Sequence, residues 1–363
     1  MEPVLDEQQS LLRESAVRLC REIGGPRRAR QLRVEGSEVD EDAWQHVIKA
    51  GWLSTAVPEA SGGLGLGMFE LALVLEEAGR QLLALPLAEA FAAVWALGRC
   101  NSGAWLAHVL DGSMRVLPAL PQLGWGNEEP PLASFGAGAF RLDGKVRFVP
   151  YGTCAQALVV LAKDSRNESL LCVVPAAAKG VSVGRAVHVD GSTQSELAFN
   201  DAAVEESHVV ARGAEASRLS ERMQELLVLG ASALLVGVAN EALDMTLEYL
   251  KVRHQFGKPL GAFQALQHRA ADRFVDIELN RSLVYRVFSA WDAGQCHPAM
   301  VSAAKARCSR CGLDTGRAAL QLHGAIGYTD EHDIGLYYKR LLVLSALYGN
   351  ESNHTARFSQ LTL

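Results

Sequence analysis

The segment YLKVRHQFGKPLGAFQALQHRAAD, residues 249–272, contains residue types that could bind a phosphate-bearing ligand. Arg253 offers a guanidinium fork for bidentate contact with a phosphate, where a helical pattern gives way to a Gly-Pro loop. Phe256 could lie against a ligand, and Gly257 would let the backbone approach it closely. Each residue alone has a simpler explanation, Arg253 as a helix-end cation and Phe256 as a core residue. Their combination favours a ligand-binding element.

A second element, QLHGAIGYTDEHD at residues 321–333, could add polar contacts to such a ligand. Gln321, like Gln264 in the first element, carries both donor and acceptor groups that suit the polar edges of a nucleotide. Gly324 could also only end a helix and open a turn, which is compatible with ligand contact. The acidic and histidine residues that follow contain catalytic types, but we interpret them as a turn that caps the next helix: Glu331, His332 and Asp333.

The elements that would position these residues follow from periodicity. Apolar residues at intervals of three and four predict helices up to about residue 101 and again from residue 214. Between them, short β-rich runs predict strands, with Asp143-Gly144 as the turn of a hairpin. The glycine-rich stretch 58–67 predicts a loop of the kind that often covers a ligand. The chain is therefore predicted to be α+β, with an N-terminal helical domain (1–111), a middle antiparallel β domain (112–212) and a C-terminal helical bundle (213–363).

Composition excludes several classes of protein. With 363 residues, 49% of them hydrophobic and 21% charged, the chain can form two or three packed domains and is not expected to be disordered. A net charge of -6 without basic runs argues against nucleic acid as a partner. Acidic residues stand where a secretory signal needs positive charge, and the apolar stretch 226–238 is too short to span a bilayer. We expect a cytoplasmic protein without a membrane partner.

Familiar cofactor and metal motifs are missing. The sequence contains neither GxGxxG between a strand and a helix nor GxxxxGK[ST], which argues against nicotinamide and nucleoside triphosphate sites. Seven cysteines form no disulfide framework and fit a reducing compartment. Cys308 and Cys311 form a CxxC, which could indicate redox chemistry or half a metal site. Because no second CxxC or nearby His pair accompanies it, we predict an ordinary helix and no metal.

Both ligand-binding elements, together with GWLSTAVPEASGGLGLG (51–67) and LEEAGR (75–80), resemble the acyl-CoA dehydrogenase family. The resemblance implies noncovalently bound FAD, an acyl-CoA substrate dehydrogenated at C2 and C3, and electron transfer to an electron-transfer flavoprotein. In the family, the arginine-containing segment contacts the cofactor of a neighbouring subunit, so the resemblance also implies an oligomer. The cofactor-binding residues that it implies are Arg253, Gln255, Phe256, Phe263, Gln264, Gln321, Gly324 and Ala325.

The catalytic base of the family is missing from its usual places. A carboxylate must accept the C2 proton while the C3 hydride goes to the flavin, and many members place a Glu after a C-terminal Tyr. Here Tyr348 is followed by Gly349. Other members place the Glu on the helix before the arginine element, at a position that Leu227 occupies here. Glu225 and Glu351 are weak candidates, since each stands two positions away; on a helix two residues rotate a side chain by about 200°.

The predicted β domain also departs from the family. Typical members carry Thr-Glu-Pro, Gly-Ser-Asp and Trp-Ile-Thr elements against the flavin ring, whereas this chain has GWGNEEPPLASFGAG (124–138) and an altered strand in 146–162. Such losses resemble those of subunits that pair with a second acyl-CoA dehydrogenase chain in a heterotetramer. The leading hypothesis is an FAD-dependent subunit for fatty acid or steroid side-chain β-oxidation whose partner supplies the base. The alternatives are a self-sufficient homotetramer with a displaced Glu and a noncatalytic subunit that completes a partner's FAD site.

Overall fold

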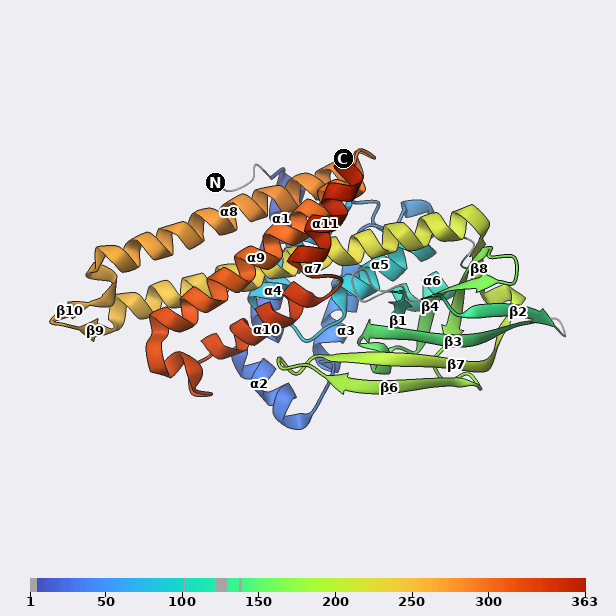
Figure 1. The fold of residues 1–363 in the computed structure, drawn as a ribbon, viewed down its shortest axis with the longest axis horizontal. Helices are drawn as coiled ribbons and strands as arrows, with labels where there is room; N and C mark the ends of the chain where they lie inside the picture. The colour runs from blue at the N-terminus through green and yellow to red at the C-terminus, as the bar shows by residue number, and fades with distance from the viewer. Residues whose placement is uncertain (1–4, 101, 103, 122–128, 137–138) are drawn as a thin grey trace. The chain divides into compact units, whose positions relative to one another are not determined.

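The computed structural model describes residues 5–100, 102, 104–121, 129–136 and 139–363. Helices come first along the chain, strands follow, and helices return, as the colours of Figure 1 show. The predicted α+β class and its helical, β, helical order are confirmed. The chain divides into two compact units: a helical unit of Met1–Gln31, Met68–Leu83 and Val228–Leu363, and a sheet unit of Leu32–Gly67 and Ala84–Leu227. The division into domains at 1–111, 112–212 and 213–363 remains a prediction.

The helical unit is built from long helices whose ends carry the expected signals. Its members are α1 (Glu7–Ile23), α4 (Met68–Arg80), the C-terminal part of α7 (Gly213–Val252), α8 (Gln264–Asp292), α9 (Pro298–His323), α10 (Ile334–Ala346) and α11 (Glu351–Thr362); α2 (Pro26–Glu35) begins in it. Asp6 and Gln9 form a capping box at the start of α1. Pro298 occupies the first turn of α9, where its missing N–H is not needed. These features fix the first turns of α1 and α9.

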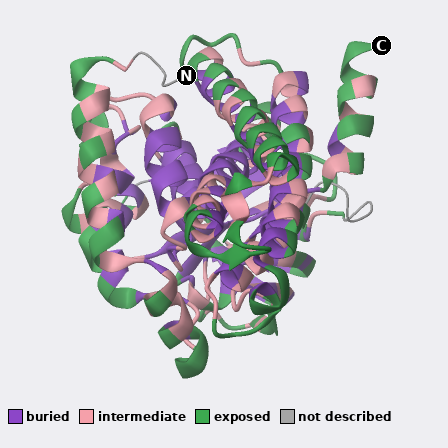
Figure 2. Cartoon of the chain, turned by 90° about the vertical axis from the view of Figure 1, so that its left-hand side faces the viewer, coloured by how far each residue is buried: buried purple, intermediate pink, exposed green. Residues whose placement is uncertain are grey.

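Two glycines let α4 and α7 cross in close contact. A Cβ at Gly237 would lie 1.9 Å from the carbonyl oxygen of Glu76, and one at Gly79 would lie 2.5 Å from that of Leu234. Both distances are impossible for a real side chain, so this crossing requires glycine. Figure 2 shows buried positions along the faces that the helices turn toward one another. Of the most apolar stretch of α7, 83% is buried, as in a core helix of a soluble fold.

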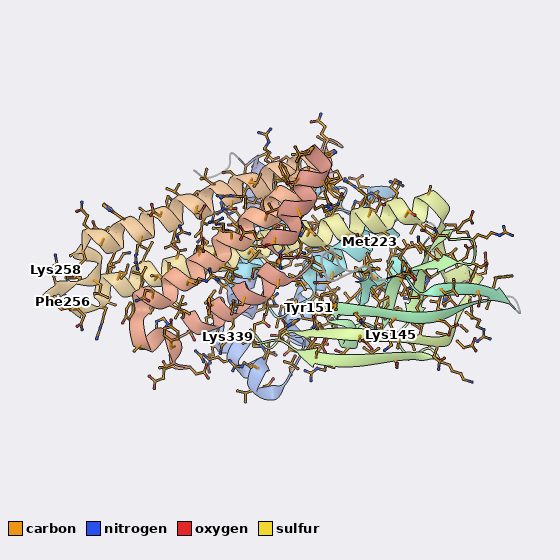
Figure 3. All side chains as sticks on the ribbon, in the orientation of Figure 1. Lys145, Tyr151, Met223, Phe256, Lys258 and Lys339 are labelled. Atoms are coloured by element: carbon orange, nitrogen blue, oxygen red, sulfur yellow. The ribbon has the colours of Figure 1, made fainter. Side chains whose placement is uncertain are left out.

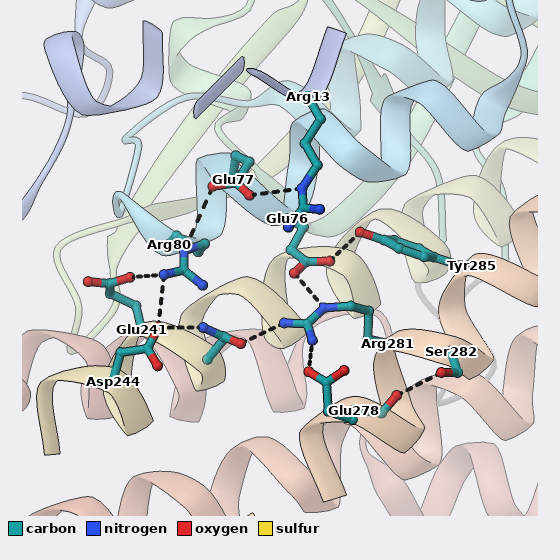
Figure 4. Close-up of polar contacts among 11 residues, drawn as sticks. Arg13, Glu76, Glu77, Arg80, Glu241, Asp244, Glu278, Arg281, Ser282 and Tyr285 are labelled. Carbon is teal, nitrogen blue, oxygen red and sulfur yellow. Dashed lines mark hydrogen bonds and ion pairs between the residues drawn. The ribbon is translucent and has the colours of Figure 1, made fainter. Parts of the chain in front are cut away.

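Buried ion pairs join the same helices. Glu76 accepts hydrogen bonds from Arg281 Nε at 2.8 Å and from the Tyr285 hydroxyl at 2.7 Å (Figure 4). Arg281 also donates to Asn240 Oδ1 at 2.6 Å. Arg80 contacts Glu241 at 2.8 Å. Desolvation raises the pKa of Tyr285, which keeps its hydroxyl a donor toward Glu76. The network therefore ties α4, α7 and α8 together through charge rather than through apolar packing alone.

The sheet unit contains α3 (Glu41–Lys49), α5 (Leu87–Leu97), α6 (Trp105–Leu110) and one mixed sheet. The strands are β1 (Val116–Ala119), β2 (Leu132–Gly136), β3 (Ala139–Pro150), β4 (Ala157–Asp164), β5 (Ser169–Pro175), β6 (Val181–Val187), β7 (Thr193–Glu205) and β8 (Val209–Arg212). Their order is β6-β7-β3-β2-β4-β5-β8, with β1 paired to β4. Most ladders are antiparallel as predicted, but β1–β4 and β2–β4 are parallel.

The hairpin predicted at Asp143-Gly144 is wrong. β3 runs through both residues, and the pairing with β7 shifts register between Leu142 and Gly144, with Gly144 at φ 132°. Asp143 Oδ1 instead accepts a hydrogen bond from the backbone N–H of Asp201 across the sheet, at 2.9 Å. A bulge and a hairpin use the same residue types, because both need a glycine outside the usual φ range. The Asp-Gly pair does mark an irregularity of the backbone, but this is a bulge within β3 and not a hairpin turn.

Candidate functional site

The predicted phosphate-binding segment forms a projecting hairpin at the end of α7. After Val252, β9 (His254–Gln255) and β10 (Lys258–Pro259) pair around Phe256 and Gly257, whose φ angles are 53° and 77°. Two consecutive left-handed residues are typical of a type I′ turn, in which a phenylalanine is costly. Phe256 is 91% exposed and lies at the tip of the hairpin (Figure 3). A large ring held outward in a strained conformation is suited to insertion into another molecule.

Polar groups surround the base of this hairpin. Arg253 is exposed, and it forms no ion pair within the described part of the chain. The Lys258 ammonium lies 4.3 Å from the centre of the Phe263 ring, which precedes the first residue of α8, Gln264. Gln255 and Gln264 are exposed. A helix N-terminus with cations beside it is favourable for a phosphate, so these residues fit a dinucleotide cofactor.

The second predicted element lies at the end of α9. Gly324 caps this helix at φ 67° and ψ -143°, and a Cβ there would meet nothing within 4 Å. A glycine is therefore needed here for its positive φ angle and not for close packing, and the space beside it is open. Gln321, Gly324 and Ala325 are all exposed. The ring of Tyr249, one turn before Arg253, stacks on His323 with centroids 4.5 Å apart, so the α7 and α9 ends meet.

In the predicted cap at residues 331–333 the accepting side chain is His332 rather than Asp333. Asp333 precedes α10 but makes no side-chain capping bond; the His332 Nδ1 accepts from the Ile334 N–H at 3.1 Å. Asp333 instead accepts from Arg30 Nε at 2.9 Å. The helical prediction for the CxxC is confirmed, because Cys308 and Cys311 lie buried within α9. Burial raises the pKa of the Cys311 thiol to about 12, which makes it unreactive at neutral pH.

Glu225, the base candidate on α7, is not arranged as a general base. Leu227 is buried at the family's position. Glu225 is buried as well, and its Oε2 accepts from Arg222 at 2.6 Å, one turn back on the same helix. A carboxylate that is already engaged by an arginine binds a proton less readily than one in an apolar pocket. Glu225, two residues before Leu227, is therefore a salt-bridged acid and not a free base.

At the C-terminal base position two consecutive residues have positive φ angles. Tyr348 and Gly349 have φ angles of 58° and 97°. The fully buried Lys305 donates through Nζ to the carbonyl oxygens of Leu344, Ser345 and Gly349, at 3.1, 3.0 and 2.9 Å. Burial lowers the pKa of Lys305 to about 7, while the carbonyl oxygens favour its charged form. Lys305 caps the end of α10 and holds the turn that presents the base in other members.

Glu351 begins α11 and faces away from this arrangement. Its Oε1 lies 3.4 Å from Arg310 NH1, and the Glu351 and Arg310 side chains are 41% and 63% exposed. Such a pair is a solvated surface contact worth about 0–1 kcal/mol. His354 holds the turn from the other side, because its Nε2 lies 2.9 Å from the Tyr348 carbonyl oxygen. Glu351 is thus a partly exposed helix-end acid in contact with a surface arginine.

The altered strand of the β region lines a hollow in the sheet unit. Residues 124–128 and 137–138 of the first altered stretch lie outside the described residues. In β3, the register with β7 shifts between Val146 and Val149, and Phe148 has φ 56°. An open pocket of about 320 Å³ lies over β3, β6 and β7, with Arg147, Phe148, Arg185, Gln194 and Glu196 in its lining. It offers one aromatic face and polar groups of both signs.

Comparison with known proteins identifies the family to which this fold belongs. Residues 6–101 match the model of the acyl-CoA dehydrogenase N-terminal domain, and residues 226–359 match that of the C-terminal domain. The chain belongs to the acyl-CoA dehydrogenase family. A chain of the solved Tcur3481-Tcur3483 steroid ACAD, a single-substitution variant, is 30% identical over 98% of both chains, with a TM-score of 0.89. The family, the enzyme class and its cofactor FAD, predicted from sequence, are therefore confirmed.

Two mycobacterial relatives are also similar to this acyl-CoA dehydrogenase family member. "Acyl-CoA dehydrogenase FadE27" of Mycobacterium tuberculosis is 29% identical over 86% of each chain. A chain of the "ChsE4-ChsE5 complex from Mycobacterium tuberculosis" is 26% identical, covers 99% of this chain and 98% of that one, and superposes with a TM-score of 0.90. The chain is thus an oxidoreductase subunit acting on CH–CH bonds, with structural neighbours that form two-protein complexes.

Proposed function

We propose that this chain is an FAD-binding acyl-CoA dehydrogenase subunit whose catalytic base comes from a second acyl-CoA dehydrogenase chain. The Tyr348–Gly349 turn carries the proposal. Gly349 has no side chain at the position where other members carry the catalytic glutamate, and its backbone carbonyl oxygen accepts from buried Lys305. The neighbours named as the ChsE4-ChsE5 and Tcur3481-Tcur3483 complexes support a two-chain assembly. The test is to purify the chain alone and together with an acyl-CoA dehydrogenase chain encoded by a neighbouring gene. The flavin spectra of the two preparations, and the bleaching of the flavin by CoA thioesters, are then compared.

In this assembly the chain's own residues bind and orient rather than move the C2 proton. Bound FAD would supply the acceptor for the hydride that leaves C3. Arg253 and the start of α8 would hold the pyrophosphate of FAD. Gln321 and the exposed Gly324 turn would contact the polar edges of its nucleotide. Phe256 would insert into the neighbouring subunit together with Gln255. The C2 proton then needs an acceptor within hydrogen-bond reach, which the partner's carboxylate would provide.

Arg253→Ala should weaken FAD binding by about 10- to 150-fold. The expected loss is that of one charge-assisted contact, about 1.5–3 kcal/mol. Titrating the apoprotein with FAD and following flavin fluorescence measures the change. Arg18→Ala provides a matched control, because Arg18 is an exposed arginine on α1, outside the proposed site. Unchanged FAD affinity in Arg253→Ala would disprove the assignment.

We expect a tetramer or a dimer of heterodimers. The α8 residues Phe274, Val275 and Leu279 are 54%, 54% and 59% exposed, and they give an apolar surface to the helix that follows the Phe256 hairpin. Leu279→Glu should shift the assembly toward smaller species in light scattering, whereas Val34→Glu, at an exposed apolar position on α2, should not. A wild-type monomer with full flavin occupancy would contradict the expectation.

The substrate class that we propose is a CoA thioester of a steroid side chain. This rests on the steroid acyl-CoA dehydrogenase among the structural neighbours. The electron acceptor would be an electron-transfer flavoprotein, and the compartment the cytoplasm. A panel of steroid and straight-chain acyl-CoA thioesters, assayed for flavin bleaching by the assembled protein, separates this class from ordinary fatty acyl groups. Bleaching by straight-chain substrates alone would exclude the steroid assignment.

Two other functions remain testable in the same preparation. A self-sufficient homotetramer would use Glu351 or Glu225 as a displaced base, and it predicts activity from the chain without a partner. A noncatalytic subunit would complete the partner's FAD site, and it predicts one bound FAD for each pair of chains. Counting flavin per chain in the purified assembly distinguishes the noncatalytic subunit from the FAD-binding subunit that we propose.

A further inference from the structure

Three aromatic side chains from different segments form a ring cluster beside the cofactor-contact residues. Tyr249 and His323 stack with centroids 4.5 Å apart and an interplanar angle of 27°. His323 and His332 are also 4.5 Å apart, with a tilt of 57°. Tyr249 meets His332 edge-on at 6.0 Å. The cluster therefore links the end of α7, the end of α9 and the loop before α10, all within the helical unit.

Two of the three rings, Tyr249 and His323, are joined to residues of the proposed cofactor site. The Tyr249 carbonyl oxygen accepts the Arg253 N–H at 2.9 Å, so the ring and the arginine lie on the same final turn of α7. His323 immediately precedes Gly324, whose left-handed conformation opens the exposed 324–325 backbone. The Tyr249–His323 contact itself joins segments that are far apart in the sequence. The stack is thus a side-chain contact between the two segments.

Hydrogen bonds set the two imidazoles in neutral, opposite tautomers. His323 Nδ1 lies 2.8 Å from the Ala319 carbonyl oxygen and must carry a proton to donate there. His332 Nδ1 accepts from the Ile334 N–H and must lack one. The His323 Nε2 is buried and has no hydrogen-bond partner among the described residues. A second proton on His323 would therefore place an unsatisfied charge in the interior.

The charges around the cluster act on His332 in both directions. Arg30 from α2 lies near His332 and opposes its protonation, while Asp333 favours it. The Arg30 Nε donates to Asp333 at 2.9 Å. Asp333 would therefore be shared between Arg30 and a protonated His332. Farther along the loop, Asp330 pairs with Lys339 at 3.6 Å. Tyr249 is the group that faces His323 from α7.

We propose that the Tyr249–His323–His332 stack is the positioning device for the two cofactor-contact segments, and that protonation of its imidazoles releases the cofactor. The inference rests on the proposed FAD-binding function of Arg253 and Gly324. Neutral rings hold the α7 and α9 ends together. Two imidazolium rings 4.5 Å apart, with Arg30 beside them, repel one another and disturb the Gly324 turn.

The direction of the pH effect follows from the burial of these rings. Desolvation is the main cause that lowers the pKa of both His323 and His332, and for His323 a nearby His332 charge adds to it. The unfolded chain takes up protons first, near the ordinary value of 6.5. The stabilisation from the stack is therefore complete above that pH and is lost as the pH falls through the lower folded pKa values.

Cofactor binding against pH tests the inference in the purified assembly. The Kd for FAD should rise about tenfold or more between about pH 7.5 and about pH 5.5 in the wild type. His323→Phe keeps a stacking ring without a titratable group, so it should bind FAD at both pH values with little change in Kd. His323→Ala removes the ring and should weaken binding at both values. His46→Phe, at an exposed histidine on α3, should retain the wild-type pH dependence.

A second readout separates this inference from the proposed function. The midpoint of thermal unfolding of the FAD-free protein should fall on acidification more in the wild type than in His323→Phe. If no FAD binds at any pH, the proposed function fails together with cofactor release, and this difference would then support only the stack as a pH-sensitive contact between the two segments. A wild-type Kd that is independent of pH, or the same pH dependence in His323→Phe, overturns the inference. His332→Phe repeats the comparison if His323→Phe does not fold.

Discussion

The isolated chain should oxidise acyl-CoA about 100- to 10,000-fold more slowly than its complex with a base-supplying partner, which is the usual contribution of a general base. Gly349 and Leu227 occupy the two positions from which family members present that base. Without a carboxylate there, only water can accept the C2 proton. Turnover of the chain alone and of the complex, measured with an artificial electron acceptor under the same conditions, gives the ratio.

Variants of this chain distinguish the outcomes. Glu351→Gln and Glu225→Gln should leave the activity of the complex nearly unchanged, because both acids are engaged by arginines, Arg310 and Arg222. Robust activity of the isolated wild type would refute the need for a partner. Its loss in one of the two variants would then identify the displaced base.

Restoring the carboxylate at position 349 should not restore activity. Gly349 has φ 97°, a conformation that a glutamate adopts only with strain, and its carbonyl oxygen is bonded to Lys305. The turn would have to rearrange before the new side chain could reach a substrate. We therefore expect the Gly349→Glu protein to be less stable than the wild type. Its activity as an isolated chain should stay as low as that of the isolated wild type. Full turnover by Gly349→Glu alone would show that the missing carboxylate is the whole defect.

Periodic patterns predicted the order of elements well, because they depend on local spacing. Helix starts such as Asp6 and Pro298 carry their signals within one turn. The error at Asp143-Gly144 arose because a bulge and a hairpin turn share the same residues, and only pairing with β7 decides between them. The two compact units were not predictable either. Contacts such as that of Gly79 with Leu234 depend on residues far apart in the sequence.

The candidate site was predicted where a motif concentrates it and missed where it does not. Arg253 to Gln264 form a continuous stretch, and their exposure fits a ligand from outside. His323 was assigned no role, although it stands beside Gly324 in the second element. Its partners Tyr249 and His332 come from other segments, so no spacing within the sequence reveals the stack. Lys305 was missed for the same reason, because its acceptors lie 39 to 44 residues away.

Arg281→Met should lower the free energy of unfolding by about 3–5 kcal/mol, the cost of leaving a buried charge without its partner. Glu76 is 3% exposed and would keep only the Tyr285 hydroxyl of its two donors shown in Figure 4. Urea unfolding of the purified chain measures the change. Arg310→Met is the matched control. Its ion pairs with Asp314 and Glu351 are largely exposed, so it should cost about 1 kcal/mol or less.

Replacing both partners separates the charge from the packing. Glu76→Gln combined with Arg281→Met removes the buried charge together with its counterion, so the double variant should be more stable than Arg281→Met alone. The Gln side chain can still accept a hydrogen bond from Tyr285, whose hydroxyl therefore remains satisfied. If the double variant loses as much stability as the two single variants added together, the pair does not interact energetically. The cost of Arg281→Met would then come from lost packing of the arginine stem between α4 and α8.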